Sequence, residues 1–100
     1  MQIEYGGCMT SINSSEKKLK LLASNKRLAI LLFLDKQKTA TVSEISEALS
    51  TSIYGVSQHL RILRGANMVL ATRRGNNVSY RLPLKKDPLI KAVLMSVKSK

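Results

Sequence analysis

A helix with hydrogen-bonding side chains, and the basic hairpin after it, are the segments of this chain best suited to chemistry. On the helix expected at residues 53–66, one face carries Tyr54, Ser57, Gln58 and Arg61. Glutamine can form two hydrogen bonds with adenine, and arginine can form two with guanine. We therefore expect this face to enter the major groove of duplex DNA. The alternative is an amphipathic surface helix whose polar face is only solvated.

Positive charge dominates residues 48–86, which contain no Asp or Glu. The basic residues there are Arg61, Arg64, Arg73, Arg74, Arg81, Lys85 and Lys86. A field of one sign attracts a polyanion, and counterion release from a nucleic-acid backbone supplies much of the affinity. The hairpin tip, residues 73–78, is expected to contact phosphates or a minor groove. The predicted DNA contacts are Ser52, Tyr54, Ser57, Gln58, His59 and Arg61 on the helix, and Arg64, Arg73, Arg74, Asn76 and Asn77 around the hairpin.

Length and composition favour one folded domain with an anionic partner. The chain has 100 residues, a 44% hydrophobic fraction and a formal net charge of +11, which suits a nucleic acid first and an anionic membrane surface second. No apolar run approaches the roughly 20 residues that span a bilayer, and no signal peptide is visible. The single cysteine, Cys8, cannot form an intrachain disulfide. We therefore expect a cytoplasmic, nucleoid-associated protein with no membrane partner.

Capping residues and apolar periods predict the elements before the polar helix. Residues 1–13 have no helical period and are expected to form a flexible tail, so that the domain covers residues 14–99. Ser14 or Ser15 can begin a helix that runs to about residue 23. Ser24 can cap a central helix from residue 25 to about residue 36. Thr41 and Glu44 match the capping box at the start of a third helix, residues 42–49.

Later signals complete a winged helix-turn-helix. Ser52 caps the fourth helix, with Ile53 and Val56 on its inner face, and Asn67 suits a left-handed residue after its end. Strands are expected at residues 68–73 and 78–82 around a turn at residues 75–77, and a last helix begins at Asp87 or Pro88. The predicted class is mainly α with a small β-hairpin, in the order helix, helix, short strand, helix, helix, strand, strand, helix.

Four segments resemble the ArsR/SmtB-type winged helix-turn-helix repressors. Residues 24–31 resemble the second-helix signature, and residues 52–60 resemble the recognition helix, where Ser-x-His-Leu recurs. Residues 64–69 resemble the exit from that helix, and residues 73–82 resemble the wing. The resemblance implies a homodimer, joined through its first and last helices, that represses transcription by covering a palindromic operator.

An apolar set on the first and last helices fits such a dimer. Its members are Leu19, Leu22, Leu89, Ile90, Val93, Leu94 and Val97. The alternative is that the last helix packs on its own domain. Two-fold symmetry would place the two reading helices about 34 Å apart.

The sequence departs from the metal-sensing members of that family. Where they carry Cys-Val-Cys-Asp, this chain has Thr41, Val42, Ser43 and Glu44. Hydroxyls are poor ligands for soft metals, so no metal and no cofactor is expected. Cys8 is either a residue without a role or a thiol that is oxidised or bridges two subunits.

Two other binding functions and an enzyme are weaker interpretations. A basic RNA- or ribosome-associated protein would favour several exposed aromatic residues, and among the four aromatics only Tyr54 is placed for stacking. A protein-interaction module would favour an uncharged or acidic helix face, which Arg61 contradicts. The sequence has no Ser-His-Asp arrangement and no glycine-rich phosphate loop, so we expect no enzyme.

Overall fold

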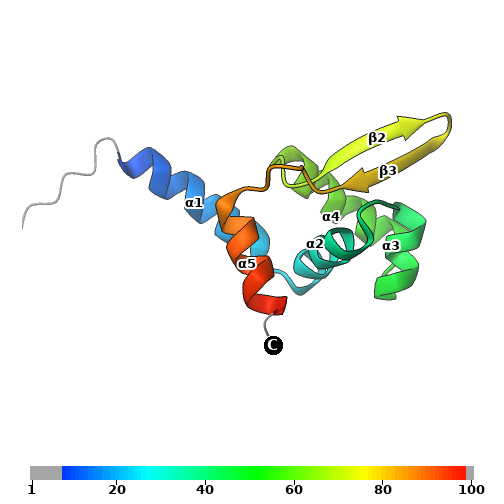
Figure 1. Ribbon diagram of the computed structural model, residues 1–100, viewed down its shortest axis with the longest axis horizontal. Coiled ribbons are helices and arrows are strands. Elements are labelled where there is room, and N and C mark those ends of the chain that lie inside the picture. The colour runs from blue at the N-terminus through cyan, green and yellow to red at the C-terminus, as the bar shows by residue number, and fades with distance from the viewer. Residues whose placement is uncertain (1–7, 99–100) are drawn as a thin grey trace, which may run out of the picture.

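The computed structural model of the protein describes residues 8–98 (Figure 1). Five helices and a three-stranded sheet make up this part of the chain: α1 Cys8–Leu22, α2 Asn25–Gln37, β1 Ala40–Thr41, α3 Val42–Leu49, α4 Ile53–Gly65, β2 Leu70–Arg74, β3 Asn77–Arg81 and α5 Pro88–Lys98. The hairpin β2–β3 projects from the helices at one end of the molecule, and α1 extends at the other (Figure 1). The predicted class, mainly helical with a small hairpin, is confirmed.

Side-chain caps start the three helices that form the helix-turn-helix and its support. The Ser24 hydroxyl accepts from the Arg27 amide at 3.4 Å at the start of α2. At α3, Thr41 Oγ1 accepts from the Glu44 amide at 3.2 Å, and Glu44 Oε1 accepts from the Thr41 amide at 2.8 Å. These bonds satisfy amides that have no partner inside the helix. The predicted caps at Ser24 and Thr41 are confirmed.

The turn between α3 and α4 is also held locally. Ser50 takes a left-handed conformation, φ 52°, at the end of α3. The Ser46 hydroxyl donates to the Thr51 carbonyl, and Ser52 Oγ accepts from the Gly55 amide at 3.0 Å. The angle between the two helices therefore rests on short-range bonds as well as on the core.

The core joins α2 to one face of each neighbouring helix. Its fully buried side chains come mainly from α2 (Ile30, Leu31, Leu34), α3 (Ile45) and α4 (Val56, Leu60, Leu63), with Met68 and Val69 after α4. Burying each such side chain stabilises the fold by about 1.5–3 kcal/mol. The predicted central position of residues 25–36 is confirmed, and α4 is thereby held with its opposite face outward.

The sheet has the order β1-β3-β2, and all its strands are antiparallel. Gly75, φ 61°, occupies the first position of a two-residue turn, where a positive φ matches the twist of a hairpin. The expected three-residue turn is wrong, because Asn77 pairs with Arg74 and belongs to β3. Strand β2 also begins later than expected, since the Met68 amide donates to Leu63 O at 2.9 Å and closes the end of α4.

The start of α1 and the exposure of Ile53 differ from the sequence predictions. Helix α1 begins at Cys8, so residues 8–13 are not part of a tail. Serine, threonine and asparagine only weakly disfavour a helix, and neither glycine nor proline interrupts residues 8–22. Ile53 is 56% exposed and not in the core, because it is the first residue of α4 and precedes the packed turn. Residues 1–7 of the predicted tail, and the side chain of Cys8, lie outside the described residues.

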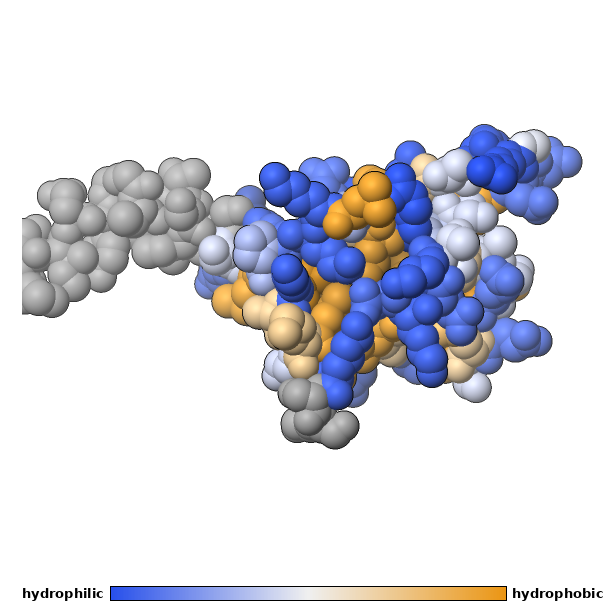
Figure 2. All heavy atoms as spheres, in the orientation of Figure 1, coloured by the Kyte–Doolittle hydropathy of each residue, from blue (hydrophilic) through white to orange (hydrophobic). Residues whose placement is uncertain are grey.

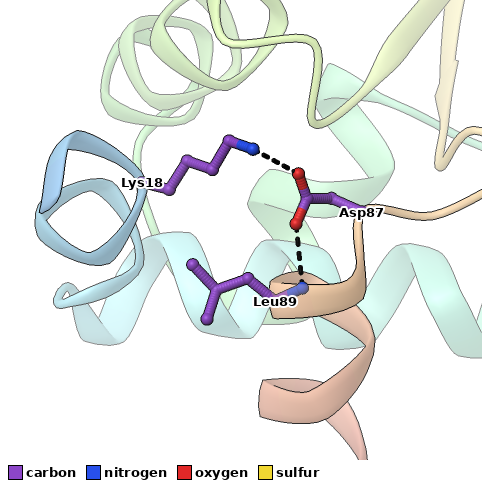
Figure 3. A network of polar contacts seen from close by, with 3 residues as sticks. All are labelled: Lys18, Asp87 and Leu89. Atoms are coloured by element: carbon purple, nitrogen blue, oxygen red, sulfur yellow. Dashed lines mark hydrogen bonds and ion pairs between the residues drawn. The ribbon is translucent and has the colours of Figure 1, made fainter. Parts of the chain in front are cut away.

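Charged contacts attach α5 to both α1 and α2. Asp87 Oδ2 accepts from Lys18 Nζ of α1 at 2.5 Å, and Asp87 Oδ1 accepts from the Leu89 amide at 2.8 Å (Figure 3). The bond from Lys18, followed by that from the Leu89 amide, lowers the pKa of Asp87. Asp35 of α2 forms ion pairs with Lys86 and Lys98. Within residues 8–98, no helix is long and apolar enough to cross a bilayer.

Candidate nucleic-acid interface

The outward face of α4 carries the polar side chains predicted for it. Tyr54 is 74% exposed, Ser57 and Arg61 are exposed, and Gln58 is half-buried. Val56 on the opposite face is fully buried. The helix is therefore anchored by one face and offers a phenol, a hydroxyl, an amide and a guanidinium on the other. This is the division that a helix in a major groove requires.

Ser52 begins this helix with a hydroxyl that has two uses. Its oxygen already accepts the Gly55 amide as the N-cap. The side chain is exposed, and a cap uses only the acceptor side of a hydroxyl. Its O–H donor therefore remains available to a phosphate oxygen at the start of the helix.

Helix α4 and the hairpin border a common hollow of about 500 Å³. Its lining comes from Ser57, Arg61, Arg64 and Gly65 of α4 and from Tyr80 of β3. The Ser57 hydroxyl and the guanidinium groups of Arg61 and Arg64 can all donate hydrogen bonds to an anion. The structure thus brings the predicted helix face and the base of the hairpin together on one surface.

The hairpin tip is exposed and strongly hydrophilic (Figure 2). Arg73, Arg74, Asn76 and Asn77 are all exposed there. The two arginines do not share a face, because successive side chains of a strand point to opposite sides. Arg73 pairs with Val78 and lies on the side of Tyr80, which faces the hollow beside α4, whereas Arg74 lies on the other side.

His59 lies apart from the other residues of the predicted helix face. It lies five residues after Tyr54, which places it about 140° around the helix from that side chain. Its Nδ1 accepts from Arg27 Nε of α2 at 3.3 Å, so it joins two helices behind the outward face. Burial, together with the charges of Arg27 and Lys26, lowers the pKa of His59. We therefore assign it to the packing of α4 on α2, and its contact with DNA stays a prediction.

Among the residues that the structure describes, the arginines of α4 and of the hairpin tip form no ion pair. Within residues 8–98, the lysines that form ion pairs are Lys18, Lys20, Lys86 and Lys98, and none of these pairs involves Arg61, Arg64, Arg73 or Arg74. These guanidinium groups are therefore available to an external anion on both faces of the hairpin and along α4.

Sequence reasoning missed two residues of this surface. Tyr80 is not among the predicted contacts, but it lines the hollow beside α4 while it also packs partly on the core. Arg81 was treated only as part of the general charge, but it lines a second hollow on the other side of the hairpin. The alternation of side chains along residues 78–82 already placed Tyr80 and Arg81 on opposite faces of the strand. It did not indicate which face lies towards α4.

The predicted dimer set divides into two groups. Leu22, Ile90 and Leu94 are buried within one chain, which leaves little of their surface for a partner. They close the core where α1 and α5 cover α2. Leu89 and Val93 are half-buried against the same core. Leu19 and Val97 are 51% and 39% exposed, and these two remain candidates for a contact between subunits.

A family model described as a helix-turn-helix domain matches residues 22–71, which run from the end of α1 into β2. Over 71 residues, the chain is 38% identical to the HTH-type transcriptional repressor SmtB of Mycobacterium tuberculosis; this covers 71% of the chain and 52% of SmtB. The chain therefore spans about half the length of that relative.

A second relative and one solved structure cover more of the chain. The arsenic resistance transcriptional regulator ArsR1 of Pseudomonas putida is 32% identical over 92 residues, which is 92% of this chain and 72% of the relative. The homodimeric winged helix-turn-helix DNA-binding domain of Mb0332 from Mycobacterium bovis has a TM-score of 0.77 at 23% identity, and the match covers 99% of this chain and 88% of that one. The similarity to this solved structure shows the fold.

Proposed function

Because this chain belongs to the ArsR/SmtB-type family of helix-turn-helix transcriptional regulators, we propose that it is a dimeric repressor which binds an inverted repeat in duplex DNA. The bound dimer blocks polymerase sterically, and the protein is not an enzyme. It works in the cytoplasm, associated with the nucleoid.

One observation carries this proposal: the outward face of α4 and the base of the hairpin meet around the hollow of Ser57, Arg61, Arg64 and Tyr80. A duplex seated on α4 would bring its flanking phosphates to the hairpin. The proposed base contacts are Tyr54, Ser57, Gln58 and Arg61. Ser52, Arg64, Arg73, Arg74, Asn76 and Asn77 are proposed to contact the backbone or the minor groove.

The proposal does not extend to metal sensing. At the positions of the Cys-Val-Cys-Asp element of metal-sensing members, Thr41 Oγ1 and Glu44 Oε1 are both engaged in the capping box. The residues of this segment do not fit a soft-metal site, since they lack a thiolate.

Selection of bound sites from a random duplex pool tests the proposed activity directly. We expect an enriched inverted repeat whose half-sites are centred about 34 Å apart, one turn of DNA. A pool without any enriched sequence, or preferential capture of single-stranded RNA in a parallel selection, would contradict the proposal and favour a general RNA binder.

The roles of helix and hairpin are separated by a pair of variants. Gln58→Ala should relax base preference at one position of each half-site by about 1–3 kcal/mol. Arg73→Ala should instead weaken all duplexes about equally and reduce the slope of log affinity against log salt by about 0.9. Gln37→Ala and Lys36→Ala, both exposed near the end of α2, are the matched controls. Equal loss on selected and random DNA in Gln58→Ala would refute the helix assignment.

A further inference from the structure

The hairpin presents donors to anions on both of its faces. The register pairs Thr72 with Ser79, and Arg74 and Arg81 follow each of them two residues along their strands. Since residues two apart share a face of a strand, all four lie on one side of the hairpin. Tyr80 lies on the other side, towards α4. We call the side that carries Thr72, Arg74, Ser79 and Arg81 the outer face of the hairpin.

A hollow of about 350 Å³ lies on the outer face. It is lined by Thr39, Thr72, Arg74, Ser79 and Arg81. Two guanidinium groups and three hydroxyls therefore surround one space, and within residues 8–98 neither arginine forms an ion pair with a carboxylate. Arg81 Nη1 donates to the Leu82 carbonyl at 3.4 Å, which leaves the other donors of the fork free.

We propose that the outer face of the hairpin is a second phosphate-binding surface, which holds the DNA backbone beyond the groove that α4 enters. This rests on the proposed function and adds Arg81 and the hydroxyls of Thr39, Thr72 and Ser79 to the contact surface. The outer face points away from α4, so the phosphates it holds flank the site that the helix reads.

The donor types favour phosphate. Guanidinium forks match phosphate oxygens with two parallel hydrogen bonds, and serine and threonine hydroxyls are common phosphate donors in DNA complexes. Each of the five lining residues has a side chain with a hydrogen-bond donor, and none is aromatic.

The spacing favours a row of phosphates over a single one. Arg74 lies opposite Asn77, which is four residues before Arg81 on β3. At about 3.4 Å per residue, the two arginine positions are separated by about 14 Å along the hairpin. The side chains of both arginines reach the one hollow from these positions, so a strand that carries a charge every 3.4 Å along the duplex axis can bind there and continue along the outer face.

The test compares two duplexes that share a central sequence. One has about 20 base pairs, enough for two half-sites, and the other has about 40, with the same added length on each side. Affinity of the full chain is measured by fluorescence anisotropy for wild type, Arg81→Gln, Arg74→Gln and Arg73→Gln. Arg73 is the matched control, since it is the neighbour of Arg74 on the opposite face.

Arg81→Gln and Arg74→Gln should each lose about three- to tenfold in affinity for the long duplex and less than about twofold for the short one. Arg73→Gln should lose affinity by the same factor on both. Thermal unfolding of each variant checks that the fold is intact. Arg74 is exposed at the hairpin tip, so its variant remains informative if the change at Arg81 disturbs the sheet.

Three results would overturn the proposal. The first is unchanged affinity of both outer-face variants for the long duplex, and the second is an equal loss on both lengths. The third is calorimetric binding of inorganic pyrophosphate that Arg81→Gln abolishes, without a length-dependent effect, which would assign the hollow to a small anion. Failure of the wider function looks different, because wild type would then bind neither duplex.

Discussion

At the scale of single residues, His59 shows how a recognition motif also contains packing residues. It follows Gln58 directly, yet its imidazole lies behind the outward face and accepts from Arg27 of α2. Burial and the nearby charges of Arg27 and Lys26 lower its pKa. Helix α4 is thus held against α2 by a neutral imidazole, while Gln58 beside it remains partly exposed.

This arrangement predicts acid sensitivity of the fold. In the unfolded chain His59 titrates near its ordinary pKa of 6.5, whereas the folded chain binds that proton less readily. Stability should therefore fall as pH drops below about 6.5, because the unfolded state then binds more protons.

Urea unfolding at pH 7.5 and pH 5 measures this effect. His59→Gln should lose less stability between the two pH values than wild type, since glutamine can still accept from Arg27 without titrating. The carboxyl groups of Asp35 and Asp87 have pKa values lowered from 3.8, so their protonation affects stability only at pH values below the range from pH 7.5 to pH 5. An identical loss in wild type and variant would remove the histidine from the explanation.

At the scale of elements, Asp87 joins the start of α5 to α1 with one carboxylate. Its Oδ1 caps the Leu89 amide and its Oδ2 accepts from Lys18 (Figure 3). The ion pair is partly exposed, with side-chain exposures of 37% and 28%, so we expect it to contribute at most about 1 kcal/mol. We expect the cap to contribute more, about 0.5–2 kcal/mol.

Two substitutions at Asp87 separate the cap from the charge. Asp87→Ala should lower the free energy of unfolding by about 0.5–2 kcal/mol, because the Leu89 amide loses its acceptor. Asp87→Asn keeps an oxygen acceptor and should lose clearly less. Thermal unfolding at low and at high salt measures both. If both variants were equally destabilised at low salt and the difference from wild type vanished at high salt, the ion pair would be the main contribution.

At the scale of the whole molecule, α1 and α5 divide their apolar residues between the core and the surface. Leu22, Ile90 and Leu94 complete the core of one chain, while Leu19, Met95 and Val97 remain exposed. The surface also carries a hydrophobic strip between hydrophilic side chains on the face seen in Figure 2. We therefore propose that a seam between two copies is built from the exposed group.

Leu19→Glu and Val97→Glu should weaken the proposed dimer without unfolding the monomer, because each side chain is already in water in one chain. Analytical ultracentrifugation should show monomers at concentrations where wild type is dimeric. Ile53→Glu, at an exposed apolar position on α4, is the control and should remain dimeric. Monomers in the Ile53 variant with dimers in the other two would move the seam to α4.

Core substitutions should behave in the opposite way. Leu94→Ala should cost about 2–5 kcal/mol of monomer stability, since it opens a cavity between α5 and α2. Chemical denaturation of a monomeric Leu19→Glu background measures this without a contribution from association. A cost below about 1 kcal/mol would place Leu94 outside the core.

Local chemistry made much of this fold predictable. The caps at Ser24, Thr41 and Ser52, and the left-handed Asn67 with φ 61°, depend on residues within a few positions of one another. The outward face of α4 followed from the helical period alone. Weak propensities were less informative, and the start of α1 at Cys8 was missed for that reason.

The sequence by itself determined the type and order of the elements, the polar face of α4 and the basic hairpin, because each depends on periodicity, capping and charge along a short stretch. Only the tertiary structure decided that His59 faces α2, that Leu94 lies in the core, and that Arg73 faces α4 while Arg74 and Arg81 face away. These outcomes depend on which surface meets which neighbour. Packing between residues distant in the chain fixes that choice, and no local pattern encodes it.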